Sequence, residues 1–459
     1  MMTCITRRAF CSNANLVEKM TTTSSAFESH KRNSRSNSMK VSEIVAFLDQ
    51  HVIGQNSAKK AVANALRNRW RRKQLPLDLQ KEIKPMNILM TGPTGVGKTE
   101  IARRLASWSD APFVKVEATK YTEVGFHGKD VDSIIQDLVD VAVKRQRPLL
   151  ESEVLPQAKL EVDSQIIDAL TGKLSSPAEK ESWLEHLHAG LLDDRTITIT
   201  VENSDQAELD DDPQAKFANA FFLKKEKRRM TVKQARERLL KDAVARLIPL
   251  DRIVELAIDR AEQEGIVFID EIDKICSAAG SNRQKADASD EGVQRDLLPI
   301  IEGCEVECKK YGKVKTDHIL FICAGAFNAV KPSDLLTELQ GRLPVRVDLS
   351  SLTEADLARI LTEPKYNILT QQQALLQTEG VNVSFPPDTV AALAKAAAEL
   401  NATVANLGAR RLQTVLDRVM ERISFEVEEG TDVSVTAEEV HSTVSSIAGK
   451  PTDLYKSIL

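Results

Sequence analysis

The sequence GPTGVGKT at Gly92–Thr99 decides the fold that we expect for this chain. It fits the pattern G-x-x-x-x-G-K-[ST], follows the apolar run NILMT, and opens a segment with helical spacing. Glycines let successive backbone N–H groups turn toward phosphate oxygens, and the start of a helix adds partial positive charge. The stretch predicts a nucleotide-binding loop in which Lys98 reaches the β- and γ-phosphates and Thr99 binds Mg²⁺.

A second apolar run, GIVFIDEIDK at 265–274, contains two adjacent carboxylates. Asp270 is expected to hold Mg²⁺, directly or through water, and Glu271 to orient and deprotonate the attacking water. Apolar residues followed by Asp-Glu are a weak signal alone, but downstream of a phosphate loop they indicate a Walker B strand. A base in this place favours hydrolysis of the nucleotide over a passive switch.

Around these motifs, short apolar runs alternate with segments of helical periodicity. Strands are expected at 87–92, 112–118, 265–270 and 318–327, and helices at 99–108 and 131–146. This alternation predicts the α/β class with a parallel sheet. The predicted division is a tail at 1–40, a nucleotide-binding domain at 41–150 and 246–348, a mostly helical inserted domain at 151–245, and a smaller C-terminal α-rich domain at 349–459.

The inserted region has an acidic segment, DQAELDDDPQ, and a basic one that begins at Lys224. No alternation of strands and helices is visible, so we expect helix and charged linker. The basic cluster Lys224–Arg229 contains Glu226, which favours a solvated helix face over a nucleic-acid contact.

Composition excludes several classes of protein. The chain has 459 residues and a net charge of −5, which argues against a nucleic-acid-binding surface over the whole molecule. No apolar run has the ~20 residues that a membrane span needs. The six cysteines form no C-x-x-C pair and no metal-ligand spacing, so we expect no metal–thiolate site, no disulfides and a reducing compartment.

The first forty residues are rich in Arg, Lys, Ser, Thr and Asn, with only two acids, Glu18 and Glu28. This composition is typical of an organelle transit peptide and favours the mitochondrial matrix. The alternative is a disordered tail with no address on a cytoplasmic protein.

One loop and two arginines each allow two interpretations. Phe126 and His127 lie between Gly125 and Gly128, in a loop whose aromatic ring is either folded into the core or held out to touch a ligand. Arg342, in a Gly-flanked loop, and Arg410, at a helix start, are either surface ion-pair partners or contacts for the γ-phosphate.

Long stretches beyond these motifs resemble the AAA+ ATPases of the Clp/Hsp100 group. They cover most of residues 41–145 and 250–425, and include HVIGQNSAKKAVANALRNRWRR, APFVKVEATKYTEVGFHGKDVDSII, EGVQRDLLPIIEG, KPSDLLTELQGRLPVRV and NLGARRLQTVL. The resemblance implies an AAA+ P-loop domain, a homo-hexameric ring, and ATP with Mg²⁺ bound between subunits.

The resemblance also assigns roles to residues. The implied catalytic residues are Lys98, Glu271 and the finger Arg342, which reaches the neighbour's ATP. The residues implied to bind ATP are Ile53, Gly95, Val96, Gly97, Lys98, Thr99, Glu100, Asp270, Glu338 and Arg410. Asn328 is the candidate for a sensor of the γ-phosphate.

By the same resemblance, Gly125, Phe126, His127 and Gly128 form a pore loop that grips unfolded protein, which reverses the simple expectation of a buried Phe126. The C-terminal tail DLYKSIL would dock into a separate threonine peptidase. The chain itself has no nucleophile motif such as G-x-S-x-G. The alternatives are a stand-alone chaperone, a nucleotide-dependent adaptor, and a DNA-directed motor of the same superfamily.

Overall fold

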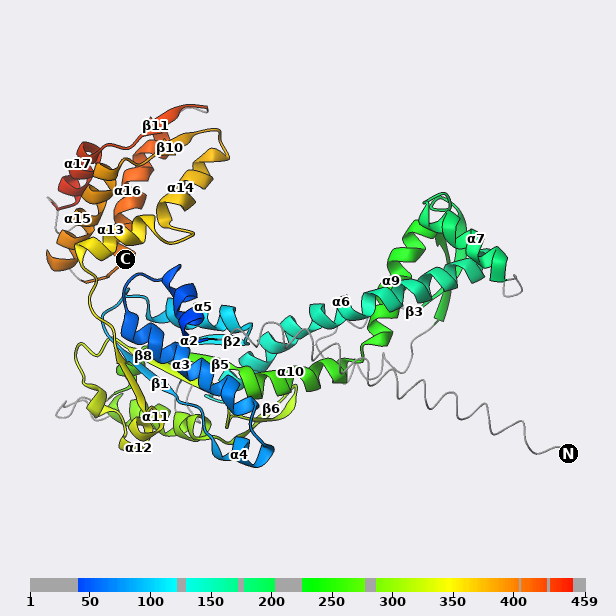
Figure 1. Ribbon diagram of the computed structural model, residues 1–459, viewed down its shortest axis with the longest axis horizontal. Coiled ribbons are helices and arrows are strands. Elements are labelled where there is room, and N and C mark those ends of the chain that lie inside the picture. Colours follow the sequence, from blue (N-terminus) through cyan, green and yellow to red (C-terminus); the bar gives the residue numbers. More distant parts are fainter. Residues whose placement is uncertain are drawn as a thin grey trace. The chain divides into compact units, whose positions relative to one another are not determined.

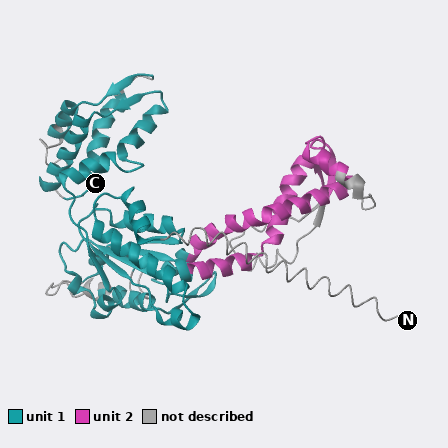
Figure 2. Ribbon diagram, in the orientation of Figure 1, with its two compact units in different colours: residues 1–138, 262–459 teal, residues 139–261 magenta. Residues whose placement is uncertain are grey.

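The computed structural model divides the chain into two compact units (Figure 2). Unit 1 contains residues 1–138 and 262–459, and unit 2 contains residues 139–261. The structure describes residues 40–121, 129–171, 177–202, 225–276, 286–403, 406–426 and 430–448. Within these ranges no helix is long and apolar enough to cross a membrane.

A five-stranded parallel sheet forms the centre of unit 1 (Figure 1). Its strand order is β2-β5-β8-β1-β9, which confirms the predicted α/β fold with a parallel sheet. The strands are β1 (Ile88–Thr91), β2 (Phe113–Glu117), β5 (Ile266–Asp270), β8 (Leu320–Gly325) and β9 (Val345–Asp348). The central strands read as continuous apolar runs because a parallel sheet is covered by helices on both faces.

Helices and short elements surround the sheet. They are α2 (Val41–Asp49), α3 (Asn56–Lys73), α4 (Leu77–Glu82), α5 (Lys98–Ser109), η1 (Ala118–Lys120), η2 (Ile272–Ile275), α11 (Ala286–Glu302), η3 (Pro332–Asp334), α12 (Thr337–Arg342) and the hairpin β6 (Glu305–Cys308) and β7 (Gly312–Lys315). One hydrophobic cluster joins one face of the sheet to α2, α3 and α5, and Ile88, Phe268 and Ile322 are fully buried in it.

The chain after Leu349 packs around a second apolar cluster, which contains Leu357, Leu393 and Leu416. Its elements are α13 (Glu354–Thr362), α14 (Ile368–Gln377), β10 (Asn382–Ser384), α15 (Pro387–Thr403), α16 (Arg410–Glu426), β11 (Asp432–Ser434) and α17 (Ala437–Ala448). Thr353 begins the first helix with a capping box, in which its side chain and that of Asp356 each accept from the other's backbone N–H.

Unit 2 contains helices and an antiparallel strand pair. Its elements are α6 (Ser133–Thr171) and α10 (Leu250–Glu264), each of which extends into unit 1, together with α7 (Pro177–His188), β3 (Thr196–Glu202), β4 (Lys225–Thr231) and α9 (Val232–Leu247). Because this unit includes much of α6 and α10, it is longer than the insertion expected at 151–245. Its core contains Val162, Ile166, Ile199 and Leu239.

The expectation of helix for the basic cluster at 224–229 is wrong. Its described part lies in β4, where Glu226 and Arg228 pair with Val201 and Ile199 of β3. The partner sequence TITITVE alternates β-branched residues with period two, which is the strand signal that the charge pattern of β4 hides. Long charged side chains are compatible with a strand when one face of the pair is solvated.

A buried arginine, Arg69, links α3 to the end of α10. Its guanidinium donates to the carbonyls of Glu264 (3.2 Å), Gln263 (2.9 Å) and His318 (3.0 Å). The last carbonyls of a helix have no partner within it, and positive charge is favourable there. Burial lowers the pKa of Arg69 to about 10, so the side chain is still cationic at neutral pH. Arg69 thus fixes the point where the chain returns from unit 2 to the sheet.

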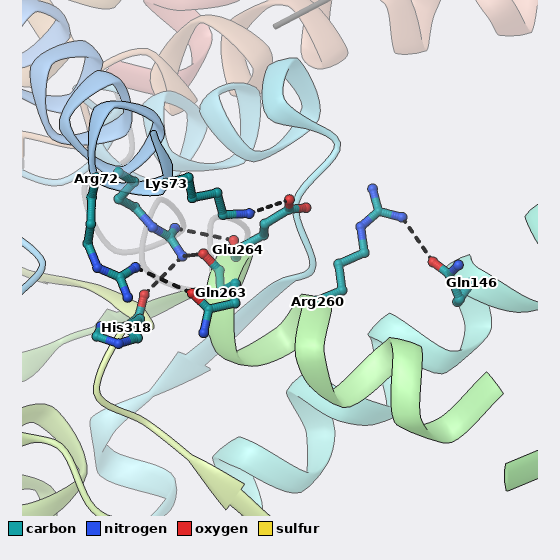
Figure 3. A network of polar contacts seen from close by, with 8 residues as sticks. Arg72, Lys73, Gln146, Arg260, Gln263, Glu264 and His318 are labelled. Carbon is teal, nitrogen blue, oxygen red and sulfur yellow. Dashed lines mark hydrogen bonds and ion pairs between the residues drawn. The ribbon is translucent and has the colours of Figure 1, made fainter. Parts of the chain in front are cut away.

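Figure 3 shows more exposed contacts of the same elements. The Lys73 ammonium pairs with the Glu264 carboxylate at 2.8 Å, and both side chains are about one-third exposed. Within unit 2, Arg260 of α10 donates to the side-chain oxygen of Gln146 in α6 at 3.3 Å.

Replacing Arg69 by methionine is expected to lower the free energy of unfolding by about 3 kcal/mol or more, because three carbonyls lose a buried donor. The matched variant Lys73→Met removes a partly exposed ion pair and is expected to cost less than about 1 kcal/mol. Urea denaturation followed by tryptophan fluorescence, to which Trp70 and Trp108 of unit 1 contribute, measures both. Equal losses would show that the Arg69 contacts contribute no more than a surface ion pair.

Candidate nucleotide-binding site

The loop between β1 and α5 has the geometry that its sequence predicts. Gly92, Gly95 and Gly97 all have positive φ angles, of 139°, 74° and 100°. Residues with a Cβ rarely adopt this region, so the three glycines are required by the backbone. Gly97 stands at the N-cap of α5 and supplies no side-chain oxygen to the first N–H groups of the helix. The backbone N–H groups at the start of α5 can therefore donate hydrogen bonds to a phosphate.

The Lys98 side chain is buried and lies over this loop. Its ammonium donates to the carbonyl oxygens of Gly92 (2.5 Å) and Pro93 (2.9 Å). Burial lowers the pKa of Lys98, the charges of Asp270 and Asp273 oppose this shift, and the charge of Arg410 adds to it. The structure therefore brings Lys98, Asp270 and Arg410 into one electrostatic site.

The Walker B carboxylate faces the loop across the sheet edge. Asp270 ends β5, and its carboxylate accepts from the Thr99 hydroxyl at 3.3 Å. A hydroxyl and a carboxylate placed together are oxygen ligands of the kind that Mg²⁺ prefers. The next residue, Glu271, has a positive φ of 58° and an exposed side chain. This uncommon backbone conformation directs Glu271 away from the strand it follows.

Two residues of the site were missed by the sequence reasoning. The ammonium of Lys115 in β2 pairs with the Asp270 carboxylate at 3.2 Å. Asp273 is 8% exposed and accepts from the backbone N–H of Ala326, directly after β8. Lys115 could have been noticed in the sequence, because it is a single lysine within the apolar run PFVKVEA. Asp273 could not, because its contact with Ala326 depends on β5 and β8 being neighbours in the sheet.

The segment HVIGQ lies beside the phosphate loop. Ile53 is 4% exposed, and a Cβ on Gly97 would come within 3.3 Å of Val52. The Gln55 side-chain amide donates to the Ser350 carbonyl (2.8 Å) and accepts from the Ser350 N–H (3.1 Å). These two bonds fix the segment to the chain that follows β9.

The sequence NLGARR reaches the same loop from the C-terminal part of unit 1. The Ala409 N–H donates to the Gly95 carbonyl at 3.0 Å. A Cβ on Gly95 would lie 2.0 Å from the Leu407 carbonyl oxygen, and a Cβ on Gly408 would lie 2.7 Å from that of Gly95. Arg410 begins α16, as predicted, and this backbone contact places it beside the site.

Arg342 and Glu338 lie elsewhere. Arg342 is the last residue of α12, so the predicted loop is wrong: TELQGR forms a short helix that includes Gly341. The Arg342 guanidinium pairs with the Glu302 carboxylate, and its carbonyl accepts from the Asn87 amide at 3.3 Å. Asn87 precedes β1, whereas the phosphate loop follows it, about 13 Å along the strand. Arg342 therefore lies at the sheet edge opposite its own nucleotide site.

Two other predicted residues have different environments. The Glu100 carboxylate pairs with Arg103 (2.5 Å) and Arg104 (2.6 Å). Burial raises the pKa of Glu100, but the hydrogen bonds from Arg104 and Arg103 outweigh this and lower it overall. Only the backbone of Glu100 is left to contact a phosphate. Asn328 is exposed, three residues beyond the end of β8, and the Asp273–Ala326 contact forms the polar link at this strand end.

Comparisons with known proteins agree with this site. The profile "ATPase family associated with various cellular activities (AAA)" matches residues 88–151, and "AAA domain (Cdc48 subfamily)" matches residues 200–364. The chain is 49% identical to "ATP-dependent protease ATPase subunit HslU" of Xanthobacter autotrophicus, over 91% of this chain and 98% of the relative. The same-named proteins of Rhizobium rhizogenes (48%) and Rhodopseudomonas palustris (49%) match over the same shares. The chain belongs to the HslU family of AAA+ ATPases.

Membership of the HslU family confirms the predicted AAA+ fold and nucleotide binding, and makes this chain an ATPase and not a peptidase. The predicted pore loop, Gly125–Gly128, and the tail Tyr455–Leu459 lie outside the described residues. The described chain on either side of the loop meets in a bridge between Tyr121 and Lys129.

No group of three His, Cys, Asp or Glu suited to a metal occurs in the described ranges of this HslU-family chain. Cys276, Cys304, Cys308 and Cys323 are not joined in disulfides within these ranges, and burial raises the pKa of Cys323 to about 12. Mg²⁺ would depend on Thr99 and Asp270 together with the nucleotide.

The variant Gly95→Ala is expected to weaken ATP binding at least about tenfold, or about 1.4 kcal/mol. Its methyl group would overlap the Leu407 carbonyl and displace the loop. Gly312→Ala is the matched control, because Gly312 also has a positive φ (83°) but no atom lies within 4 Å of the position that its added methyl would occupy. Titration calorimetry with ATP measures both, and equal affinities would contradict the steric argument.

Proposed function

We propose that this chain is the ATPase subunit of an ATP-dependent protease, which unfolds proteins and feeds them to an HslV-type threonine peptidase. The observation that carries the proposal is the gathering of Lys98, Thr99, Asp270 and Arg410 around the glycine loop, in a chain whose relatives bear the name of that subunit. The AAA+ superfamily also includes other motors, so the peptidase partner is the part that needs direct testing.

Each residue of the site has a separate task in hydrolysis. The N–H groups at the start of α5 and the Lys98 ammonium bind the β- and γ-phosphates. Thr99 and Asp270 would hold Mg²⁺, which neutralises phosphate charge when bound. Glu271 accepts a proton from the attacking water, and its exposed position lets the water approach. Lys115 holds the Asp270 carboxylate in place.

Arg342 acts on the nucleotide of a neighbouring subunit in a homo-hexamer. Its place beside the amino end of β1 supports this role, because the chain's own phosphate loop follows the other end of that strand. Positive charge on the γ-phosphate stabilises the transition state, and an arginine supplied in trans can provide it. Glu338, one turn earlier on α12, faces the same interface.

ATP turnover moves the pore loop through contacts that begin at the site. Arg410 and the Gly95–Ala409 contact report the state of the nucleotide to the C-terminal helices. Next to Glu271, η2 contacts η1, which leads directly to Tyr121 at the base of the loop. Phe126 and His127 then grip an unfolded chain, and Gly125 and Gly128 let the loop move.

The tail Tyr455–Leu459 docks into the peptidase, and the segment 1–40 directs the chain to the mitochondrial matrix. Support for the address comes only from its Arg-rich, Ser-rich and acid-poor composition. A fusion of residues 1–40 to a fluorescent protein that stays in the cytosol would refute it.

Complementation tests the action of Arg342 in trans. Glu271→Gln and Arg342→Ala are each expected to lower ATP hydrolysis at least about 100-fold. An equal mixture should regain activity, up to about a quarter of the wild-type rate, because about one interface in four joins an intact Glu271 to an intact Arg342. Arg346→Ala, a nearby exposed arginine in β9, should keep the rate without complementation. If the mixture stays inactive, Arg342 does not act across subunits.

Reconstitution with an HslV-type peptidase and ATP tests the protease assignment. Degradation of unfolded casein is expected, and removal of Tyr455–Leu459 should abolish it while ATP hydrolysis continues. Phe126→Ala should keep ATP hydrolysis and lose degradation of a folded substrate. ATP-dependent unfolding without peptidase stimulation would instead identify a stand-alone chaperone, and a steeply salt-dependent affinity for DNA would identify a DNA motor.

A further inference from the structure

A buried glutamine joins two segments that the proposed mechanism treats separately. Gln294 lies in α11 and is 2% exposed. Its side-chain N–H donates to the Ile275 carbonyl at 2.6 Å, and its side-chain oxygen accepts from the Leu336 N–H at 2.9 Å. One side chain therefore satisfies two backbone groups that are 61 residues apart in the sequence (336 − 275).

The partners determine which way the amide points. A backbone carbonyl can only accept and a backbone N–H can only donate, so Nε2 must face Ile275 and Oε1 must face Leu336. Glutamine has both a donor and an acceptor at the end of its side chain at every pH, whereas an ionised glutamate of the same length can only accept. A buried bridge of this type is stable only when both ends are satisfied.

Both partner segments belong to the catalytic apparatus. Ile275 ends η2, the short 3-10 helix that begins directly after Glu271. Leu336 is the N-cap of α12, the helix that contains Glu338 and ends at Arg342. Gln294 thus connects the segment behind the water-activating carboxylate of one nucleotide site to the helix that serves the neighbour's site.

The same helix α11 contacts α12 at its other end. Glu302 lies eight residues after Gln294, about 12 Å along α11, and pairs with Arg342. The Asn87 amide adds bonds to the carbonyls of Ile301 (3.5 Å) and Arg342 (3.3 Å). Because α12 is attached at both ends, a displacement of η2 is passed to the whole helix and not only to its first turn.

We propose that Gln294 is a positioning residue that couples adjacent ATP sites of the ring, by transmitting the state of the Glu271 segment to the helix of Arg342. This inference rests on the proposed function, since it requires Arg342 to act across subunits. Gln294 touches neither nucleotide. Its loss should therefore reduce communication between sites more than it reduces ATP binding.

Mixed rings test the coupling. Subunits carrying Glu271→Gln are assembled with active subunits at increasing fractions, and the ATPase rate is measured at each fraction. In mixed rings that keep Gln294, the ATPase rate is expected to fall more steeply than the fraction of active subunits, because each inactive subunit constrains its neighbour. When both partners also carry Gln294→Met, the rate should follow that fraction, reaching about half at an equal mixture.

Two further variants keep the test decisive. Gln294→Asn keeps the amide on a side chain one methylene shorter, which cannot span both the Ile275 carbonyl and the Leu336 N–H, so it should also give a proportional decline, and it replaces Gln294→Met if that variant does not assemble. Gln340→Met removes the bonds from α12 to the carbonyls of Ser333 (3.1 Å) and Leu335 (2.8 Å) without touching η2, and should keep the steep curve.

The outcomes separate the two proposals. A steep curve in the Gln294 variants, or a proportional curve in Gln340→Met, would overturn the role of Gln294 while leaving the ring mechanism in place. A proportional curve in the mixed rings that keep Gln294 would mean that the ATP sites act independently. There would then be no coupling for Gln294 to transmit, and the proposal would be wrong. ATP affinity, measured in parallel, should change less than about threefold in the Gln294 variants.

Discussion

The burial of one positive charge organises the nucleotide site. The Lys98 ammonium is removed from water, and it is compensated by the carbonyls of the glycine loop and by the carboxylates of Asp270 and Asp273. A buried ion without such partners would be costly, so the loop after β1, the end of β5 and the start of η2 must meet at one place. The strand order of the parallel sheet brings them there, because the carboxyl ends of its strands share an edge.

Local chemistry explains what the sequence predicted well. The glycine loop, Asp270 and the alternation of strands and helices each depend on residues close together in the chain, so their patterns are readable without a structure. Lys115, Asp273 and Gln294 were not assigned because their partners lie in other elements. The strand β4 was missed for a related reason: its charges suggested a helix, and its pairing partner lies 23 or more residues earlier.

The two ends of the parallel strands carry different groups of residues. Residues that bind the chain's own nucleotide follow the carboxyl ends of the strands, whereas Arg342 and Asn87 lie near the amino end of β1. In the ring that we propose, such a subunit has its own phosphate site on one side and its contribution to a neighbour's site on the other. The helix α11 spans the distance between them, with Gln294 toward the first and Glu302 toward the second.

The contact between Gly95 and the segment Leu407–Ala409 is made by backbone atoms and excluded volume. Mobile ions screen interactions between exposed charges, as in the pair of Lys73 and Glu264, but have no effect on steric contact. This backbone contact between the phosphate loop and the segment before α16 is therefore insensitive to ionic strength. A change in the salt content of the compartment would alter the surface of this protein and leave that mechanical connection as it is.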